Sequence, residues 1–335
     1  MASSGDGRGA ETVSPAGAPP PTGQQFRLVH GDQEVVVTEV GATLRSYRVG
    51  ERPVLLGFGE SERADYGMGQ MLMPWPGRVG DGRYRWDGEV HQLAIDEPER
   101  GNAIHGLVRW VSWSAEPVSA DRLVMRHRLA PSDGYPFCLD LAVTYALGDE
   151  GLGVTVSATN VGGASAPFGA GAHPYLTVGT PLIDTCLLRL PGGTVLDVDA
   201  RMLPTRRVAV EGTRYDFRHP RACGDVRLDI AYTDLERDPD GLARVSLESP
   251  EGRRVVLWLD QAHPWVLVFT GDALPHGSRR RGIAVEPMTC PPDAFRSGVD
   301  LIILEPGGST TARWGIDVTG LRGQAASPPP GDDRC

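Results

Sequence analysis

The sequence predicts an all-β protein, a large antiparallel β-sandwich with few short helices. Short runs of β-branched and aromatic residues recur along the chain, and they have the length and composition of strands. Gly, Pro and Asp, which favour turns, separate these runs. No long stretch repeats its apolar residues with the 3.6-residue period of a surface helix.

The predicted strands follow one another along the chain without intervening helical segments. The turn sequences "GDGRY" and "WDGE" separate further short strands near residues 80–90. This alternation of strands and turns is typical of antiparallel sandwiches. The runs that predict the main strands are 34–40, 153–160, 253–259, 265–270, 301–304 and 313–318.

One folded domain is predicted over residues 25–321, between two disordered tails. Residues 1–24 contain no aromatic residue, Leu or Ile, and residues 322–335 read "RGQAASPPPGDDRC". Neither segment can bury enough apolar surface to offset the entropy lost on ordering. The region between them has no linker-like stretch and no short internal repeat, so we expect a single β-sandwich domain.

The charge and the basic residues exclude several kinds of function. The formal net charge is -10, and the short arginine pairs have acidic neighbours, which argues against a nucleic-acid partner. The sequence contains no lysine. A lysine Schiff base, a pyridoxal-phosphate lysine and a P-loop lysine are therefore excluded.

The cysteines predict free thiols and a cytoplasmic protein. Their number is odd and no CxxC occurs, so a disulfide framework or a zinc site is not expected. The N-terminal sequence lacks the pattern of a signal peptide. No apolar run reaches the roughly 18 residues of a membrane-spanning helix. The cysteines are Cys138, Cys186, Cys223, Cys290 and Cys335.

Two of the eight histidines lie in small, apolar surroundings with glycine close by. They are His105 in "GNAIHGLVRW" and His173 in "GAHPYL". A buried imidazole needs a hydrogen-bond partner. Each is therefore either a core histidine satisfied by a backbone carbonyl or a residue that handles protons or a ligand. The other six have polar or charged neighbours and are expected at the surface.

Glu286 is the candidate general base. It follows the apolar residues "IAV" and precedes a proline in "GIAVEPMTCPPDAF". Burial at the end of a strand raises the pKa of a carboxyl group toward the range that suits a general base. The alternative is a glutamate that anchors a loop through backbone N–H groups. Asp293, in the following "PPDA" turn, is expected to cap a helix.

Asp229 and Arg78 are candidate binding residues. Asp229 stands between apolar residues in "VRLDIAYTDL", and Arg78 lies in the Pro/Gly-rich loop "PWPGRVGDGRY". An arginine on a rigid loop can hold a hydroxyl or a carboxylate. The alternatives are an edge-strand charge and a surface arginine. Tryptophans near these motifs suit the C–H face of a sugar, although tryptophan in a β-sandwich is more often a core residue. They are Trp75, Trp86, Trp110 and Trp113.

The motifs together resemble the aldose 1-epimerase (galactose mutarotase) family, and the bacterial branch is the most similar. "PWPGRVGDGRYRWDGEVHQL", "GNAIHGLVRW", "GAHPYLTVG", "LDIAYTDL", "FTGD" and "AVEPMTCPPDAF" occur in the order and spacing of that family. The resemblance covers nearly all of residues 25–320. It implies a β-sandwich of galactose mutarotase type and a cofactor-free interconversion of the α and β anomers of a free hexose.

The resemblance also implies roles for particular residues. Glu286 matches the glutamate that removes the proton of the anomeric hydroxyl, and His173 matches the histidine that protonates the ring oxygen. Arg78, His105 and Asp229 match positions that hold sugar hydroxyls. The expected partner is a small sugar, with no nucleic acid, membrane, cofactor or metal, and the chain is expected as a monomer or homodimer.

Two residues depart from the family pattern. Gly77 stands where family members usually carry Asn, and Leu267 stands where the galactose-active branch has Gln. Both changes remove polar groups from the expected sugar site. Since fewer polar groups fix fewer hydroxyls, the identity of the sugar stays open.

A phosphorylated hexose is the first alternative substrate, and it would require clustered arginines such as Arg78, Arg83 and Arg109. A non-catalytic sugar-binding protein that has kept the pocket is a second possibility.

Two further alternatives use the same acidic and histidine residues in other chemistry. His105, His173 and Glu286 have the composition of a two-histidine, one-carboxylate metal site. Asp229 and Glu286 have the composition of a glycosidase carboxylate pair.

Overall fold

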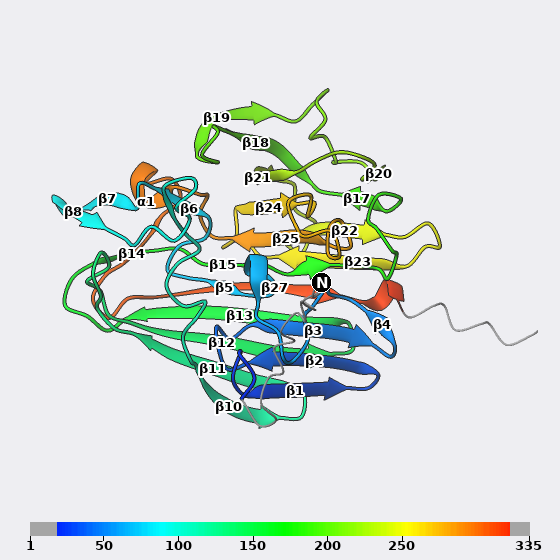
Figure 1. Ribbon diagram of the computed structural model, residues 1–335, viewed down its shortest axis with the longest axis horizontal. Coiled ribbons are helices and arrows are strands. Elements are labelled where there is room, and N and C mark those ends of the chain that lie inside the picture. Colours follow the sequence, from blue (N-terminus) through cyan, green and yellow to red (C-terminus); the bar gives the residue numbers. More distant parts are fainter. Residues whose placement is uncertain (1–18, 322–335) are drawn as a thin grey trace, which may run out of the picture.

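The computed structural model describes residues 19–321 as two large antiparallel sheets with smaller sheets around them. Figure 1 shows β11–β13 and β27 in the lower half and β18, β21, β24 and β25 in the upper half. In spatial order the nine-stranded sheet consists of β10 (Ser114–Ser119), β11 (Arg122–Leu129), β12 (Leu139–Gly148), β13 (Gly151–Asn160), β27 (Ser309–Asp317), β23 (Arg254–Leu259), β22 (Ala243–Glu248), β17 (Leu187–Arg189) and β20 (Arg221–Ala222).

The second large sheet has eight strands. In spatial order it contains β19 (Pro204–Ala209), β18 (Gly192–Val198), β21 (Asp229–Leu235), β24 (Trp265–Phe269), β25 (Ile283–Met288), β15 (Gly171–Ala172) and β5 (Met71–Leu72), and β16 (Tyr175–Leu176) also pairs with β25.

Smaller elements complete the described part of the chain. A four-stranded sheet contains β1 (Gln25–His30), β2 (Gln33–Thr38), β3 (Leu44–Val49) and β4 (Arg52–Pro53). The two-stranded pairs are β14 (Ala166–Phe168) with β26 (Ile302–Leu304), β6 (Arg78–Gly80) with β9 (Asn102–Ile104), and β7 (Arg83–Trp86) with β8 (Glu89–Gln92). The helices are α1 (Ala294–Ser297) and the 3-10 turns η1 (Asp65–Gly67) and η2 (Thr319–Leu321). Within residues 19–321 no helix is long and apolar enough to cross a membrane.

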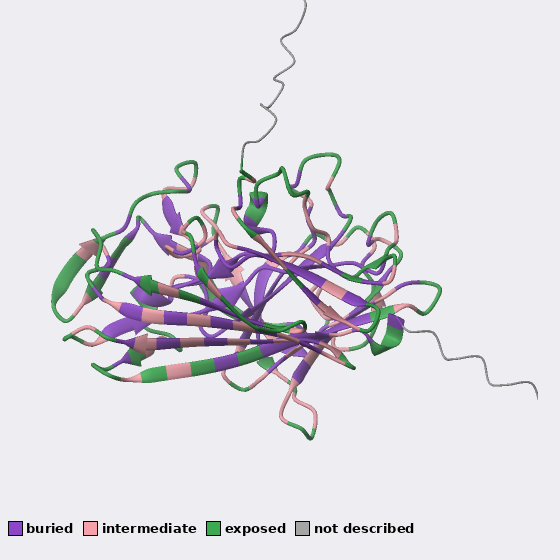
Figure 2. Cartoon of the chain, turned by 90° about the horizontal axis from the view of Figure 1, so that it is seen from below, coloured by how far each residue is buried: buried purple, intermediate pink, exposed green. Residues whose placement is uncertain are grey.

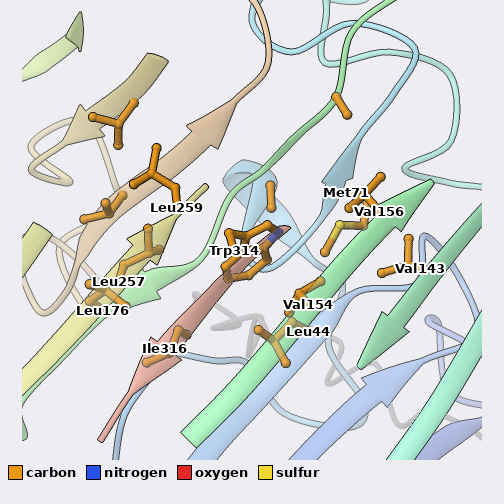
Figure 3. Packing of buried hydrophobic residues seen from close by; sticks show 14 of the residues in the cluster. Leu44, Met71, Val143, Val154, Val156, Leu176, Leu257, Leu259, Trp314 and Ile316 are labelled. Atoms are coloured by element: carbon orange, nitrogen blue, oxygen red, sulfur yellow. The ribbon is translucent and has the colours of Figure 1, made fainter. Parts of the chain in front are cut away.

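Strand alternation builds the core between the two large sheets. Along β12 and β13 every second residue is buried, as expected when one face of a sheet packs inward and the other meets solvent. Figure 2 shows this alternation as bands along the strands. The buried Trp314 of β27 lies directly opposite Val154 and Leu259 of the neighbouring strands. Figure 3 shows its indole at the centre of the packed aliphatic side chains.

The predicted all-β class is confirmed, and each predicted main strand coincides with an observed one. The run 34–40 corresponds to β2, which ends at Thr38, and 301–304 corresponds to β26. The "GDGRY" and "WDGE" turns separate β6, β7 and β8 as expected. The sole α-helix of the described chain has four residues.

Parts of the predicted tails fall outside the described residues, namely 1–18 and 322–335. Residues 20–24, which the prediction included in the N-terminal tail, form a turn that packs against the chain after β2. The Gln24 N–H donates to the Glu39 carboxylate (3.0 Å), and the Val40 N–H donates to the Thr22 carbonyl (3.0 Å). The buried Thr22 side chain shows that the packed chain begins before residue 25.

Candidate active site

The outer face of the eight-stranded sheet carries a row of side chains from β21, β24 and β25. Glu286 of β25 is directly opposite Leu267 of β24, and Asp229 of β21 is directly opposite Phe269 of β24. Because side chains alternate along a strand, these four share one face. The residues between them point into the core between the sheets.

The register of the neighbouring strands brings His173 to Glu286. His173 lies between β15 and β16, and both of these short strands pair with β25. Gly171, two residues before His173, is opposite Met288, which is two residues after Glu286. Tyr175, two residues after His173, is opposite Ala284, which is two residues before Glu286. The antiparallel pairing therefore sets the two side chains against each other.

A cavity of about 440 Å³ opens over this face and contains all five predicted site residues. Arg78, His105, His173, Asp229 and Glu286 all line it, so the structure brings them together. Gly77, Arg109, Trp110 and Leu267, which were considered above without being assigned to the site, also line it. The lining residues that no sequence pattern indicated are Asp65, Tyr66, Gly67, Asp96, Glu97, Glu99, Arg100, Ile104, Tyr175, Phe269 and Ala273.

His173 and Glu286 form a buried pair at the base of the cavity. Nε2 of His173 lies 3.2 Å from Oε1 of Glu286, and their side chains are 7% and 2% exposed. Burial, helped by the Asp229 charge, raises the pKa of Glu286 well above its usual range. Burial also lowers the pKa of His173 to about 3, and the charges of Arg109 and Arg78 act in the same direction. Both groups therefore favour their neutral forms.

The second polar atom of each group has no partner among the described residues. Oε2 of Glu286 and Nδ1 of His173 are buried and make no hydrogen bond. An unsatisfied buried polar atom costs stability, and such atoms are common where a ligand or a reaction needs them. Oε2 is thus available to accept a proton from a bound hydroxyl.

His105 is held as a neutral donor by the neighbouring loop. The backbone N–H of Gly77 donates to Nδ1 of His105 (3.2 Å), and the backbone N–H of His105 donates to the Gly77 carbonyl (2.8 Å). With Nδ1 as the acceptor, the hydrogen-bond network assigns the proton to Nε2. Burial, together with the charge of a protonated His173, keeps the pKa of His105 well below its usual value. Its Nε2–H can donate to a ligand.

Arg78 is fixed by a bidentate ion pair. Its Nε and Nη2 both donate to the Glu97 carboxylate, each at 2.9 Å, and the two side chains are 12% and 7% exposed. Burial opposes the charge of Arg78, but Glu97, Asp229 and Glu286 outweigh this effect and raise its pKa. Two nitrogens are thus used for anchoring, which leaves Nη1 for a ligand.

Every arginine that lines the cavity has a carboxylate partner. Arg100 pairs with Glu97 (2.9 Å) as Arg78 does, and Arg109 pairs with Asp96 (2.9 Å). Arg83, which the phosphorylated-substrate alternative also used, is exposed on β7 and does not line the cavity. The lining contains six carboxylates and three arginines, a balance that does not favour a phosphate group.

The structure explains one departure from the family pattern and locates the other. Gly77 has φ +67°, and a Cβ there would lie 2.9 Å from the ring carbons of Pro292. The local packing thus accommodates glycine and no side chain. Leu267 stands next to Glu286 in the sheet and lines the cavity, so this departure makes the floor of the site more apolar.

Two expectations outside the cavity need correction. Asp293 is the residue before α1, but its side chain does not cap that helix; it accepts a hydrogen bond from the Gly80 N–H (2.9 Å). His263 was expected at the surface, yet its side chain is 1% exposed and contacts Asp260 at 3.0 Å. Its polar neighbours in the sequence do not reveal this long-range packing.

The tryptophans divide between core and cavity. Trp75 and Trp113 are buried, Trp86 is half-buried, and Trp110 is exposed at the mouth of the cavity. The guanidinium carbon of Arg63 lies 4.6 Å from the centre of the Trp110 ring, which restrains this side chain. Over residues 19–321, no group of three or more His, Cys, Asp or Glu side chains has an arrangement that could hold a metal ion.

Comparison with known proteins shows the family. The model of the aldose 1-epimerase family matches residues 24–317. The chain is 34% identical over 288 residues to YihR of Escherichia coli K12, an uncharacterized protein, and the alignment covers 85% of this chain and 90% of that protein. The chain therefore belongs to the aldose 1-epimerase family, and the resemblance stated above is confirmed.

Solved structures show the same fold. A putative aldose 1-epimerase from E. coli K12 superposes with a TM-score of 0.77 at 24% identity, covering 89% of this chain and 99% of that one. The galactose 1-epimerase of Lactobacillus acidophilus superposes with a TM-score of 0.75 at 20% identity, covering 88% of this chain and 93% of that one. The galactose mutarotase type of β-sandwich is thus confirmed.

Proposed function

We propose that this protein is a mutarotase that interconverts the α and β anomers of a free hexose by general acid–base catalysis. The observation that carries the proposal is the buried His173–Glu286 pair, whose Nε2 and Oε1 are 3.2 Å apart at the base of the cavity. Anomer interconversion needs one group that takes a proton from the anomeric hydroxyl and one that gives a proton to the ring oxygen. Both oxygens are bonded to C1, so these groups must lie close together.

Ring opening moves two protons and breaks one bond. The Glu286 carboxylate accepts the proton of the O1 hydroxyl while His173, protonated on Nε2, donates to the ring oxygen O5. The C1–O5 bond breaks, O1 becomes the aldehyde oxygen, and O5 becomes a hydroxyl. After rotation about C1–C2, the neutral His173 takes the O5 proton and Glu286 returns its proton to O1, so no net proton is consumed.

The electrostatics of the pair suit this cycle. With the closed sugar bound, Glu286 is a carboxylate and His173 is protonated, whereas with the open chain bound both residues are neutral. The net charge of the pair is zero in both states, so the total charge in the cavity stays constant. Burial favours neutral forms of both residues, which stabilises the pair that accompanies the reactive open-chain intermediate. Burial of the pair thus lowers the energy of its neutral state relative to its ionised state.

The remaining lining residues can hold the sugar. The Nε2–H of His105 and the Nη1 of Arg78 are donors, and the Asp229 carboxylate makes no hydrogen bond to any residue between 19 and 321. Burial raises the pKa of Asp229, and a sugar hydroxyl that donates to the carboxylate would favour its ionised form. Leu267 and Phe269 offer an apolar surface for the C–H face of the ring.

Polarimetry of freshly dissolved α-D-glucose and α-D-galactose tests the proposal. The wild-type protein should speed the approach to equilibrium with at least one sugar, and Glu286→Gln and His173→Asn should each reduce the catalysed rate by at least about 10²-fold. His263→Asn is the matched control, because it also removes a buried imidazole but lies outside the cavity. A wild-type rate equal to buffer would overturn the proposal.

The same assay addresses the other substrates. Hexose 6-phosphates are expected to react more slowly than free hexoses, because all three cavity arginines are paired with carboxylates. Binding of a sugar without any turnover would instead identify a non-catalytic binding protein.

A further inference from the structure

The orientation of His173 is not set by a hydrogen bond to its second ring nitrogen. A catalytic imidazole is usually oriented by a partner on the nitrogen that does not react. Here Nε2 faces Glu286, while Nδ1 is buried and has no partner among residues 19–321. Packing must therefore hold the ring in place.

Three contacts surround the imidazole, and one of them is the ring of His105, which meets it edge-on with centroids 5.5 Å apart. The ring of Tyr175 stacks on the imidazole of His173, with centroids 5.0 Å apart and an interplanar angle of 11°. Gly67 lies against the edge of the imidazole, because a Cβ at that position would be 2.5 Å from Cδ2 and 3.0 Å from Nε2 of His173. The left-handed backbone of Gly67, with φ +75°, permits this approach.

The contacts from Tyr175 and Gly67 belong to one connected unit. The Tyr175 hydroxyl donates to the carbonyl of Tyr66 (2.9 Å), the residue before Gly67. The same segment holds the backbone of His173: the Gly69 N–H donates to the His173 carbonyl, and the His173 N–H donates to the Gln70 carbonyl. The ring, the turn η1 and the histidine backbone thus restrain one another.

We infer that Tyr175 is a positioning residue, and that it fixes the His173 imidazole toward Glu286 together with the Tyr66–Gly67 turn. This inference rests on the proposed function. The ring stack is the essential part, and the hydroxyl bond to Tyr66 secures the tyrosine itself. A small rotation of the imidazole moves Nε2 away from the ring oxygen of the sugar, and a displacement of about 1 Å can reduce a rate by about 10²-fold.

The chain offers a matched control at a second tyrosine–histidine stack. Tyr84 stacks on His91 with the same centroid separation of 5.0 Å, and its hydroxyl also donates to a backbone carbonyl. Tyr84 is buried like Tyr175, and neither Tyr84 nor His91 lines the cavity. Loss of this stack reports the effect of removing a buried tyrosine without changing the site.

The kinetic test compares Tyr175→Leu, Tyr175→Phe and Tyr84→Leu in the mutarotation assay. Tyr175→Leu should reduce kcat by about 10- to 100-fold with little change in KM. Tyr175→Phe, which keeps the ring, should restore most of the rate, and Tyr84→Leu should leave kcat within about twofold of wild type. Equal kcat values for Tyr175→Leu and Tyr84→Leu, or a change in KM alone, would overturn the inference.

A second readout does not depend on catalysis. Long-range ¹H–¹⁵N spectra of the imidazoles, assigned with His173→Asn, should show one fixed tautomer of His173 in the wild type and in Tyr175→Phe. Tyr175→Leu should shift or broaden these signals, whereas Tyr84→Leu should not. Unchanged His173 signals in Tyr175→Leu would refute the positioning role even if the protein catalyses no mutarotation.

Discussion

The ion pair between Glu97 and Arg78 connects the stability of the protein to its binding site. Glu97 holds Nε and Nη2 of Arg78, and it also accepts hydrogen bonds from Arg100 and Asn102 at 2.9 and 2.8 Å. Glu97→Gln removes the charge but keeps the shape of the side chain. Because both ions of the pair with Arg78 are nearly buried, we expect a loss of about 3 kcal/mol in the free energy of unfolding at pH 7.

The pH dependence gives this prediction a definite sign. Burial opposes ionisation of Glu97, but its partners, led by Arg78, outweigh burial and lower its pKa from 4.5. The stabilising contribution of Glu97 is therefore complete at pH values above its pKa in the unfolded chain. It is lost as the pH falls through the lower pKa that Glu97 has in the folded protein. The difference between wild type and Glu97→Gln should stay constant from pH 7 to 6 and shrink below about pH 4.5.

Urea unfolding followed by circular dichroism measures both effects. Glu116→Gln is the matched control, because it removes a carboxylate that pairs with Arg126 at 3.0 Å while both side chains are about 60% exposed. This surface pair should contribute at most about 0.5 kcal/mol. A Glu97→Gln protein that is as stable as Glu116→Gln, or a difference that does not shrink in acid, would refute the reasoning.

Three further predictions concern the cavity. Gly77→Asn should destabilise the protein by about 1–3 kcal/mol in the same urea assay, because its Cβ would lie 2.9 Å from Pro292. Leu267→Gln should leave the fold intact and change the ratio of kcat/KM between glucose and galactose, and an unchanged ratio would show that this position does not contact the sugar. The profile of kcat/KM against pH should show no inflection near 6.5, because burial lowers the pKa of His173 to about 3; activity should instead fall at high pH, where Glu286 with its raised pKa releases the last proton of the pair. An inflection near pH 6.5 would show that His173 titrates as an exposed histidine.

Local patterns in the sequence predicted some of the long strands, but they did not single out β11 and β12, which have eight and ten residues. The strands β13, β23 and β24 are buried on one or both faces. Such burial selects β-branched residues, so these strands can be recognised from their local composition. The two-residue strands β5, β15 and β16 are too short to show alternation. Their positions are set by pairing within the eight-stranded sheet, and β15 and β16, which both pair with β25, bring His173 to Glu286.

The site shows the same division between local and long-range information. Glu286, His173, His105, Asp229 and Arg78 could be singled out because each stands in an unusual local sequence, and the family motifs supplied their expected roles.

Contacts across the fold were not predictable from those motifs. Glu97 and Arg78 are 19 residues apart, and no pattern in either segment indicates that they pair. The stack of Tyr175 on His173 depends on the turn at Gly67, a segment that the sequence analysis did not connect with the site. The "HPY" motif was the only local signal that could have drawn attention to Tyr175.

A double-mutant cycle shows whether Glu286 and His173 act as one acid–base unit. Exchange between the two anomers of the preferred hexose, measured by NMR at equilibrium, gives the catalysed rate for wild type, Glu286→Gln, His173→Asn and the double variant. Groups that act as a unit have strongly non-additive effects. We expect each single variant to lose at least about 10²-fold in rate and the double variant to be at most severalfold slower than the single variants. Single variants that keep the wild-type rate, or losses that multiply in the double variant, would contradict this expectation.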